Sequence, residues 1–252
     1  LPSAEGDTSG KRHIFCRDIL TGTTELISRA TGPEGAEATD RSFTPAISWD
    51  GRYIAFASLA TNLAPNTSSK KHIYIRDRIS QTTVLVTKNA SEQEGNNTSN
   101  LTGSRRCFSK DAKWLVFDSN ASNLVDPNNN EDFSDDDLNG SKDIFVYAHL
   151  EPPASEPRIR LLSWASNGDS SGGSGTFGSS QAVISSDGTY VVFKSSSTTI
   201  VNLDNNSSED IFLRTRRIST VDSWDSSNAH TDRVSMKDNG DEIEEDSSAP
   251  DI

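Results

Sequence analysis

The stretch PAISWDGRYIAFAS, residues 45–58, has the pattern of a complete β-hairpin. The pair Asp50-Gly51 separates two short segments and supplies the positive φ angles that a tight hairpin turn requires. Two further copies follow in the chain: RCFSKDAKWLVFDS (residues 106–119) and AVISSDGTYVVFKS (residues 182–195). Asp187-Gly188 repeats the turn, and Asp111-Ala112 is a weaker version of it. A hairpin that recurs in this way indicates an internal repeat, and the repeat decides the fold.

A second hairpin lies between the copies of the first. Its leading strand occurs four times, as HIFCRD (13–18), HIYIRD (72–77), DIFVYA (143–148) and DIFLRT (210–215). Each copy is followed by a turn and another strand-like segment, namely TELIS (24–28), TVLVT (83–87), IRLLS (159–163) and TDRVS (231–235). The repeating unit therefore contains four strands and recurs roughly every 60 to 70 residues.

The third strand of the unit is apolar on both faces. In its first copy Ile14 and Cys16 point one way and Phe15 points the other. Such a sheet must be covered on both sides, as in a stack of small sheets, and four-stranded units stacked radially form a β-propeller. We therefore predict an all-β fold, a β-propeller of four-stranded antiparallel blades, with about four blades here and incomplete ends. Residues 45–48 should lie nearest the axis and residues 83–87 at the rim.

The repeat resembles a known family. The pattern S-x-D-G-R-Y-I-A-F, followed by A-T/S-N-L and D-I-F-V, is similar to the WD40-like, TolB-type (PD40) propeller repeats of bacterial periplasmic and surface proteins. It is carried by residues 48–56, 60–63, 121–124 and the four third strands. The resemblance covers nearly the whole chain. It implies the propeller fold and an extracellular, cell-surface or periplasmic location, but it leaves the function open because such propellers serve many purposes.

The repeat also divides the chain into blades. We expect a single propeller segment over residues 1–252, with a partial blade at 1–43, blades at 44–104, 105–180 and 181–248, and the start of a further blade at 249–252. The final APDI aligns with TPAI at 44–47. This register predicts a segment of a longer polypeptide whose further blades close the ring, and a self-contained four-bladed ring is the alternative.

The composition narrows the possible partners. The net charge of −13 argues against a nucleic-acid backbone as partner, and it fits a soluble protein or one that binds cations. No apolar run reaches the roughly 18 residues of a membrane span. The expected partners are therefore another protein or further blades of the same polypeptide.

Two loops before third strands have the residues of a calcium site. Alternate positions of the first loop carry oxygen ligands, at Asp137, Asn139, Ser141 and Asp143. The second loop repeats the spacing with Asp204, Asn206, Ser208 and Asp210. Calcium binds six to eight oxygens, and this is the ligand order of the first half of an EF-hand-like loop, although neither loop has the bidentate Glu at position 12. The alternative is an Asx turn, in which these side chains bond their own backbone.

The sister loops at 7–13 and 66–72 provide an internal comparison. They carry Lys11, Arg12, Lys70 and Lys71, and cations beside the site would repel calcium. We therefore expect calcium, if it binds, at the first loop and possibly the second, whereas the sister loops should stay empty.

The remaining reactive residues do not form a catalytic pattern. Cys16 and Cys107 occupy core columns and should not form a disulfide. His13 and His72 are interpreted as structural or surface residues, and His149 is expected in an exposed turn. The sequence contains no G-x-S-x-G nucleophile elbow.

These observations favour a non-catalytic binding or scaffold propeller of an exported or cell-surface protein, which is not itself an enzyme. The alternative is the propeller domain of a larger secreted enzyme, such as a peptidase with its catalytic domain elsewhere. The sequence beyond these residues would discriminate between them. A nucleophile elbow or zinc motif would favour the enzyme, and further repeats or anchoring domains would favour the scaffold.

Overall fold

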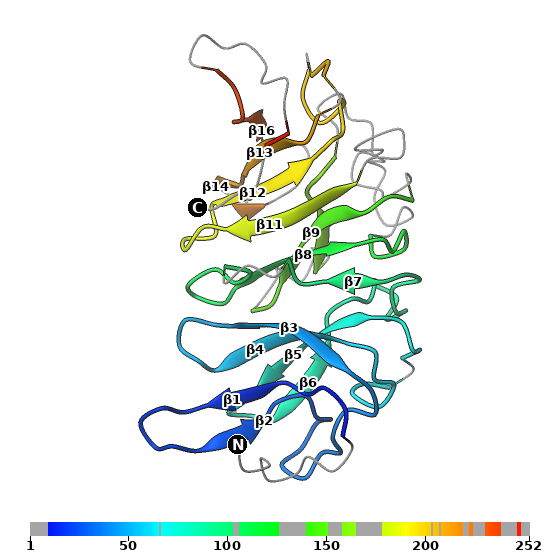
Figure 1. Ribbon diagram of the computed structural model, residues 1–252, viewed down its shortest axis with the longest axis vertical. Coiled ribbons are helices and arrows are strands. Elements are labelled where there is room, and N and C mark those ends of the chain that lie inside the picture. Colours follow the sequence, from blue (N-terminus) through cyan, green and yellow to red (C-terminus); the bar gives the residue numbers. More distant parts are fainter. Residues whose placement is uncertain are drawn as a thin grey trace.

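The computed structural model describes most of the chain as β-sheet. The described residues are 10–65, 67–102, 106–125, 140–150, 158–164, 178–202, 204–206, 208–218, 222–223, 230–237 and 246–247. Within these ranges all regular elements are strands, and none of the described segments forms a helix long and apolar enough to cross a membrane. The strands form three four-stranded sheets and two two-stranded sheets. Figure 1 shows the main sheets following one another along the long axis of the molecule.

The first two sheets have the predicted strand order. β1 (Phe15–Arg17) and β2 (Thr24–Leu26) form a two-stranded sheet, which supplies the third and fourth strands of the partial first blade. β3 (Ser42–Ile47), β4 (Tyr53–Ser58), β5 (His72–Asp77) and β6 (Thr82–Leu85) then pair antiparallel in chain order. β3 and β6 lie at opposite edges, in the order expected for an axial and a rim strand.

The next two sheets repeat this arrangement. The third contains β7 (Ser99–Asn100), β8 (Trp114–Ser119), β9 (Asp143–Ala148) and β10 (Ile159–Leu161). The fourth contains β11 (Ser179–Ile184), β12 (Tyr190–Ser195), β13 (Asp210–Thr215) and β16 (His230–Arg233). A short hairpin of β14 (Arg217–Ile218) and β15 (Asp222–Ser223) separates β13 from β16. The predicted blade start at 249–252 lies outside the described residues.

The first strand of the third sheet is interrupted. In the second sheet Ser42 lies opposite Ser58 and Ile47 lies opposite Ile54, so five positions separate the two pairs on β3. In the third sheet the equivalent pairs begin at Ser99 and Phe108, which are nine positions apart. The strand thus contains four extra residues, and the strand predicted to begin at residue 106 is reduced to the single bridge at Phe108.

The interrupted segment bonds to the neighbouring sheet instead. Ile184 donates its backbone N–H to the Arg106 carbonyl at 3.0 Å, and Lys110 donates to the Ser186 carbonyl at 2.8 Å. The hydroxyl of Thr102 also donates to the Ala182 carbonyl at 2.6 Å. The third and fourth sheets are therefore joined by backbone groups as well as by side chains.

The core consists of three apolar clusters, one at each junction between successive sheets. On β5, Ile73 and Ile75 pack towards the third sheet while Tyr74 packs towards the first. Each four-stranded sheet also has one stacked aromatic pair between its second and third strands, at Phe56–Tyr74 (5.8 Å), Phe117–Phe145 (5.5 Å) and Phe193–Phe212 (5.8 Å). The prediction that the sheets are apolar on both faces is confirmed for these blades.

A buried arginine connects the first two sheets. Arg76 on β5 is 2% exposed, and its guanidinium donates to the carbonyls of Ala30 (3.0 Å), Gln81 (2.7 Å) and Gly32 (3.2 Å). Ala30 and Gly32 lie in the loop after β2, so these bonds cross the junction. Arg214 has the same position on β13, where its guanidinium lies 4.1 Å from the Trp164 ring.

The position of His149 differs from the prediction. It was expected in an exposed turn, but its ring lies edge-on to Tyr53 with centroids 4.5 Å apart and also approaches Phe108 and Tyr147. The turn after β9 folds against the second sheet, which is a long-range contact. Burial lowers the pKa of His149 to about 4.

The hairpin turns have the predicted geometry. In each, a serine hydroxyl donates to the turn aspartate, at Ser48–Asp50 (2.6 Å), Ser109–Asp111 (2.7 Å) and Ser185–Asp187 (2.6 Å). The next residue has a positive φ angle in all three turns, at Gly51 (73°), Ala112 (57°) and Gly188 (70°). A left-handed residue is thus required even where the sequence provides alanine.

Two glycine substitutions test this geometry. Gly51→Ala and Gly188→Ala each place a Cβ at positive φ, which costs about 1–2 kcal/mol. The added Cβ at Gly188 would also lie 2.7 Å from Trp114 Cδ1, whereas the nearest atom to a Cβ at Gly51 is Arg78 Nη1 at 3.8 Å. We expect Gly188→Ala to lower the free energy of unfolding by about 1 kcal/mol more than Gly51→Ala in urea titrations. Equal losses would contradict the packing of Trp114 on the turn.

The burial of His149 predicts a pH dependence of stability. The folded-state pKa of about 4 lies below the ordinary value of 6.5, so the folded protein resists protonation of this ring. The contribution of the neutral imidazole to the free energy of unfolding is intact above pH 6.5, and it is lost as the pH falls towards 4. Between pH 7 and 4.5, His149→Phe should lose about 2–3 kcal/mol less stability than the native chain. The control is His230→Gln, because that imidazole is exposed. An unchanged pH dependence in His149→Phe would show that the ring is accessible to protons.

Candidate functional site

The end of the sheets where the third strands begin has one arrangement in all four blades. In each blade, the hydroxyl of a Ser or Thr after the fourth strand accepts a hydrogen bond from the third strand. The donor is the backbone N–H of the second residue of the third-strand segment. The bonds are Ile14–Ser28 (3.0 Å), Ile73–Thr87 (3.2 Å), Ile144–Ser163 (3.0 Å) and Ile211–Ser235 (3.0 Å). The outer two strands are therefore aligned in the same way in every blade.

The same hydroxyl also bonds the side chain at the first position. Its partner is an imidazole Nδ1 at His13 (3.0 Å) and His72 (3.1 Å), and a carboxylate Oδ1 at Asp143 (2.6 Å) and Asp210 (2.5 Å). All four side chains are buried, with exposures of 8% or less. His13 and His72 are thus structural. Asp143 and Asp210 each use one carboxylate oxygen in the same role.

The first predicted calcium loop is described only in part. Asp137 and Asn139 lie outside the described residues, while Ser141 and Asp143 lie within them. Across the part of the chain that the structure describes, no group of three or more His, Cys, Asp or Glu side chains is placed to hold a metal. Calcium at this loop therefore stays a prediction.

The second predicted loop brings two of its carboxylates together around a guanidinium. Arg233 Nη1 lies 3.1 Å from Asp204 Oδ1 and 3.5 Å from Asp210 Oδ2, and all three side chains are 6% exposed or less. Asn206 accepts the Ser208 backbone N–H at 3.0 Å, as in an Asx turn. Calcium at this loop also stays a prediction, but Arg233 would compete with it for both carboxylates.

The sister blades contain the opposite charge arrangement. His72 Nε2 lies 3.1 Å from Glu94 Oε2, and His13 Nε2 lies 3.9 Å from Glu37 Oε2. Burial lowers the pKa of His72, although Glu94 favours its protonated form. In these blades the basic group is on the third strand and the acid comes from a loop, whereas in the fourth blade the acid is on the third strand.

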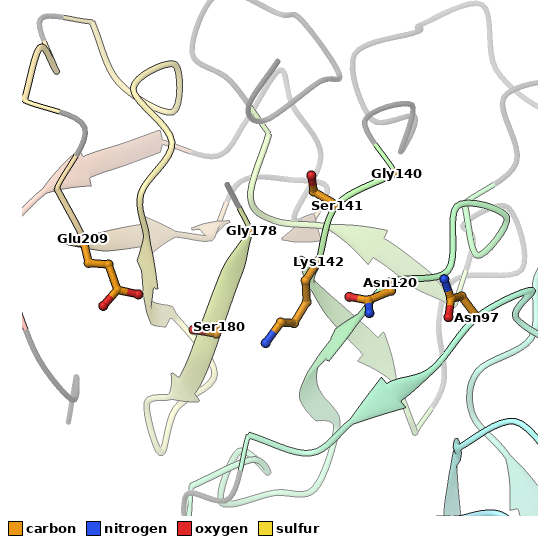
Figure 2. Close-up of a pocket in the computed structure, with 8 residues that line it drawn as sticks. All are labelled: Asn97, Asn120, Gly140, Ser141, Lys142, Gly178, Ser180 and Glu209. Carbon is orange, nitrogen blue, oxygen red and sulfur yellow. The ribbon is translucent and has the colours of Figure 1, made fainter. Parts of the chain in front are cut away.

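A polar cleft of about 460 Å³ lies between the third and fourth sheets, beside Gly140 and Ser141 of the first predicted calcium loop. Its lining is polar or glycine, comprising Asn97, Asn120, Gly140, Ser141, Lys142, Gly178, Ser180 and Glu209. Figure 2 shows Lys142 and Glu209 extending towards the cleft from its two sides. Gly178 lets these sheets approach, because an added Cβ there would lie 3.0 Å from Lys142 Cβ.

Lys142 belongs to a row of cations at this end of the sheets. The carbonyls of Arg12, Lys71 and Lys142 accept the backbone N–H of Ser42, Ser99 and Ser179 at 2.8, 2.8 and 2.6 Å, so they mark the same position at three successive junctions. We call Arg12, Arg41, Lys71 and Lys142 the cationic row.

Three members of the cationic row lie around one aromatic ring. Arg12, Arg41 and Lys71 all lie within 6 Å of the Phe43 ring centre, at 5.5, 5.9 and 5.6 Å. Burial raises the pKa of Asp118, and the charges of Lys142 and Lys71 partly oppose this change. The charges of both lysines therefore act on the same carboxyl group. In the sequence, Arg12 and Lys71 were interpreted only as residues that repel calcium. The cationic row could not be predicted, because its members come together only when successive repeats are packed side by side.

Comparisons with known proteins agree with the fold. No family model and no curated protein matches this chain. Among solved structures it is similar to TolB from Acinetobacter baumannii, with 18% identity over 81% of this chain and 35% of that one and a TM-score of 0.42. A putative TolB from Agrobacterium tumefaciens has 14% identity over 90% of this chain and 58% of that one, with a TM-score of 0.46. The tricorn protease has 15% identity over 89% of this chain and 20% of that one, with a TM-score of 0.45.

Two of these three structures carry the TolB name, which is the family that the sequence resembles. This chain spans between 20% and 58% of the length of these three proteins.

The Arg233 ion pairs can be tested with calcium present and absent. Arg233→Met leaves the buried carboxylates of Asp204 and Asp210 without this cation, so we expect it to destabilise the fold by about 3 kcal/mol. Millimolar calcium should raise the melting temperature of this variant more than that of the native chain, because the competitor has gone. A second change, Asp204→Asn, should remove that extra gain. A variant as stable as the native chain, with or without calcium, would contradict the ion pairs.

Proposed function

We propose that this chain is a non-catalytic binding propeller of an exported or cell-surface protein, and that its cationic row holds an acidic segment of a protein partner. One observation carries the proposal. The same repeat position supplies a cation at three successive junctions, although the chain as a whole has a net charge of −13. A row of one sign on a protein of the other sign attracts a ligand locally.

The geometry of the row favours carboxylates. Three cations surround Phe43 and repel one another, and an anion between them would relieve this repulsion. Arg12 and Arg41 are exposed, and guanidinium groups bond carboxylates through two parallel hydrogen bonds. The overall negative charge opposes a long polyanion such as nucleic acid, so the ligand should be short.

The cleft beside Lys142 supplies hydrogen-bonding groups for the rest of the ligand. The amides of Asn97 and Asn120 and the hydroxyl of Ser180 can bond a peptide backbone, which has both donors and acceptors. Glu209 on the far side is paired with Lys194 at 2.8 Å and presents negative charge. An acidic segment should therefore run along the row and end near Lys142.

Calcium at residues 137–143 stays a prediction. Lys142 has the repeat position of Arg12 and Lys71, so its charge opposes calcium at this loop as theirs does in the sister loops. The other expectation, that this chain is the propeller domain of a larger secreted enzyme, stays a prediction. The sequence beyond these residues would discriminate between this enzyme domain and the binding propeller.

Binding of a fluorescein-labelled peptide rich in Asp and Glu, measured by anisotropy, tests the proposal. The native chain should bind it saturably, with weaker binding as the salt concentration rises. The double variant Lys71→Gln/Lys142→Gln should bind several-fold more weakly. Lys113→Gln is the matched control, because Lys113 precedes β8 at the opposite end of the same sheet. Equal binding by both variants, or equal binding of a basic peptide, would reject the cationic row as the site.

A further inference from the structure

The repeat position that supplies a cation at three junctions holds a carboxylate in the fourth sheet. Ser247 donates its backbone N–H to the Glu209 carbonyl at 2.6 Å, as Ser179 does to the Lys142 carbonyl. Glu209 directly precedes β13, and Lys142 directly precedes β9. The charge at this position is therefore positive in the first three sheets and negative in the fourth.

The side chains of Lys142 and Glu209 lie on opposite sides of the same cleft. In Figure 2 they extend towards Ser180 from its two sides. The two sheets that bound this cleft have four paired strands each. The cleft thus has one positive wall and one negative wall, both built on paired strands.

The negative wall keeps its charge although a lysine lies beside it. Lys194 Nζ donates to Glu209 Oε2 at 2.8 Å, which fixes the direction of the carboxylate. An ionised carboxylate can accept about four hydrogen bonds through its two oxygens, and the Glu209 side chain is 39% exposed. The backbone N–H of Glu209 also donates to the Asp246 carboxylate at 2.9 Å, which brings a second negative charge to this wall. A second cationic donor can therefore bind here.

An acidic segment that follows the cationic row meets this negative wall beyond Lys142. Another acidic side chain would be repelled by Glu209, whereas an α-ammonium group would be attracted. An ammonium group has three donors, and the oxygens of Glu209, Ser180 and Asn120 are acceptors that line the cleft. Within an acidic segment, only a free amino terminus provides such a group.

We propose that the cleft binds the free amino terminus of the partner's acidic segment, with its α-ammonium group at Glu209 and its first acidic side chains at Lys142. This placement rests on the proposed function, and it fixes the direction of the segment, which continues from Lys142 towards Lys71. The partner is accordingly a protein whose mature chain begins with acidic residues. Capture of a terminal amine is a known mode of peptide recognition.

Two peptides of Asp and Glu, each labelled with fluorescein at its carboxyl end, test the proposal by anisotropy. One has a free amino terminus, and the other is acetylated, which removes the terminal charge. At neutral pH the native chain should bind the free peptide about fivefold more tightly, as expected for one exposed ion pair. This preference should largely disappear at about pH 9, because an α-amino group has a pKa of about 8 whereas lysine stays charged.

Two variants assign the preference to Glu209. Glu209→Gln should bind both peptides equally, because the amide carries no charge. Glu25→Gln is the matched control, since Glu25 forms an ion pair of the same length, 2.8 Å, with Arg78 beside the turn at the opposite end of the sheets. This control should keep the preference. Circular dichroism should show that both variants keep the native fold, and the acetylation and pH measurements on the native chain need neither variant.

The outcomes separate this proposal from the proposed function. If the native chain binds neither peptide, both fail. Equal binding of the two peptides by the native chain would leave the cationic row as the site and would overturn the amino terminus in the cleft. A preference that persists in Glu209→Gln would also overturn it. So would a peptide labelled at its amino end that loses affinity when its carboxyl end is amidated, because the carboxyl end would then occupy the cleft.

Discussion

The constraint behind this architecture is that each small sheet is apolar on both faces. A sheet of four short strands cannot hide both faces by itself, so it is stable only between two neighbours. The three apolar clusters lie at the junctions for this reason, and each draws its residues from two successive sheets. The stacked aromatic pairs and the buried arginines extend the same junctions, because each side chain projects from one sheet onto the next.

One hydroxyl group in each blade allows the charge at the start of the third strand to differ between blades. A Ser or Thr oxygen can donate and accept at once. It accepts the third strand's N–H in every blade and pairs with an imidazole in two of them and a carboxylate in the other two. The backbone alignment is therefore kept while the charge at this position changes. The surrounding partners change with it, from Glu94 beside His72 to Arg233 beside Asp210.

The sequence predicted what depends on local order. Strand order follows from the two hairpins of the repeat, and the turns follow from the Asp-Gly pairs. Both predictions were confirmed. The contacts of His149, Arg76 and Arg233 could not be predicted in this way, because their partners come from other sheets or distant loops. The cationic row is intermediate. Arg12 and Lys71 were noticed as charges, but their grouping around Phe43 depends on how successive blades are placed.

The four extra residues in the first strand of the third sheet make the mechanical coupling along the row of sheets unequal. Stacked repeats that touch only their neighbours can open one at a time, with a cooperativity set by each interface. Between the third and fourth sheets the backbone bonds from Arg106 and Lys110 add to the apolar cluster. The cleft lies between these two sheets, so the added bonds help to fix the spacing of its walls.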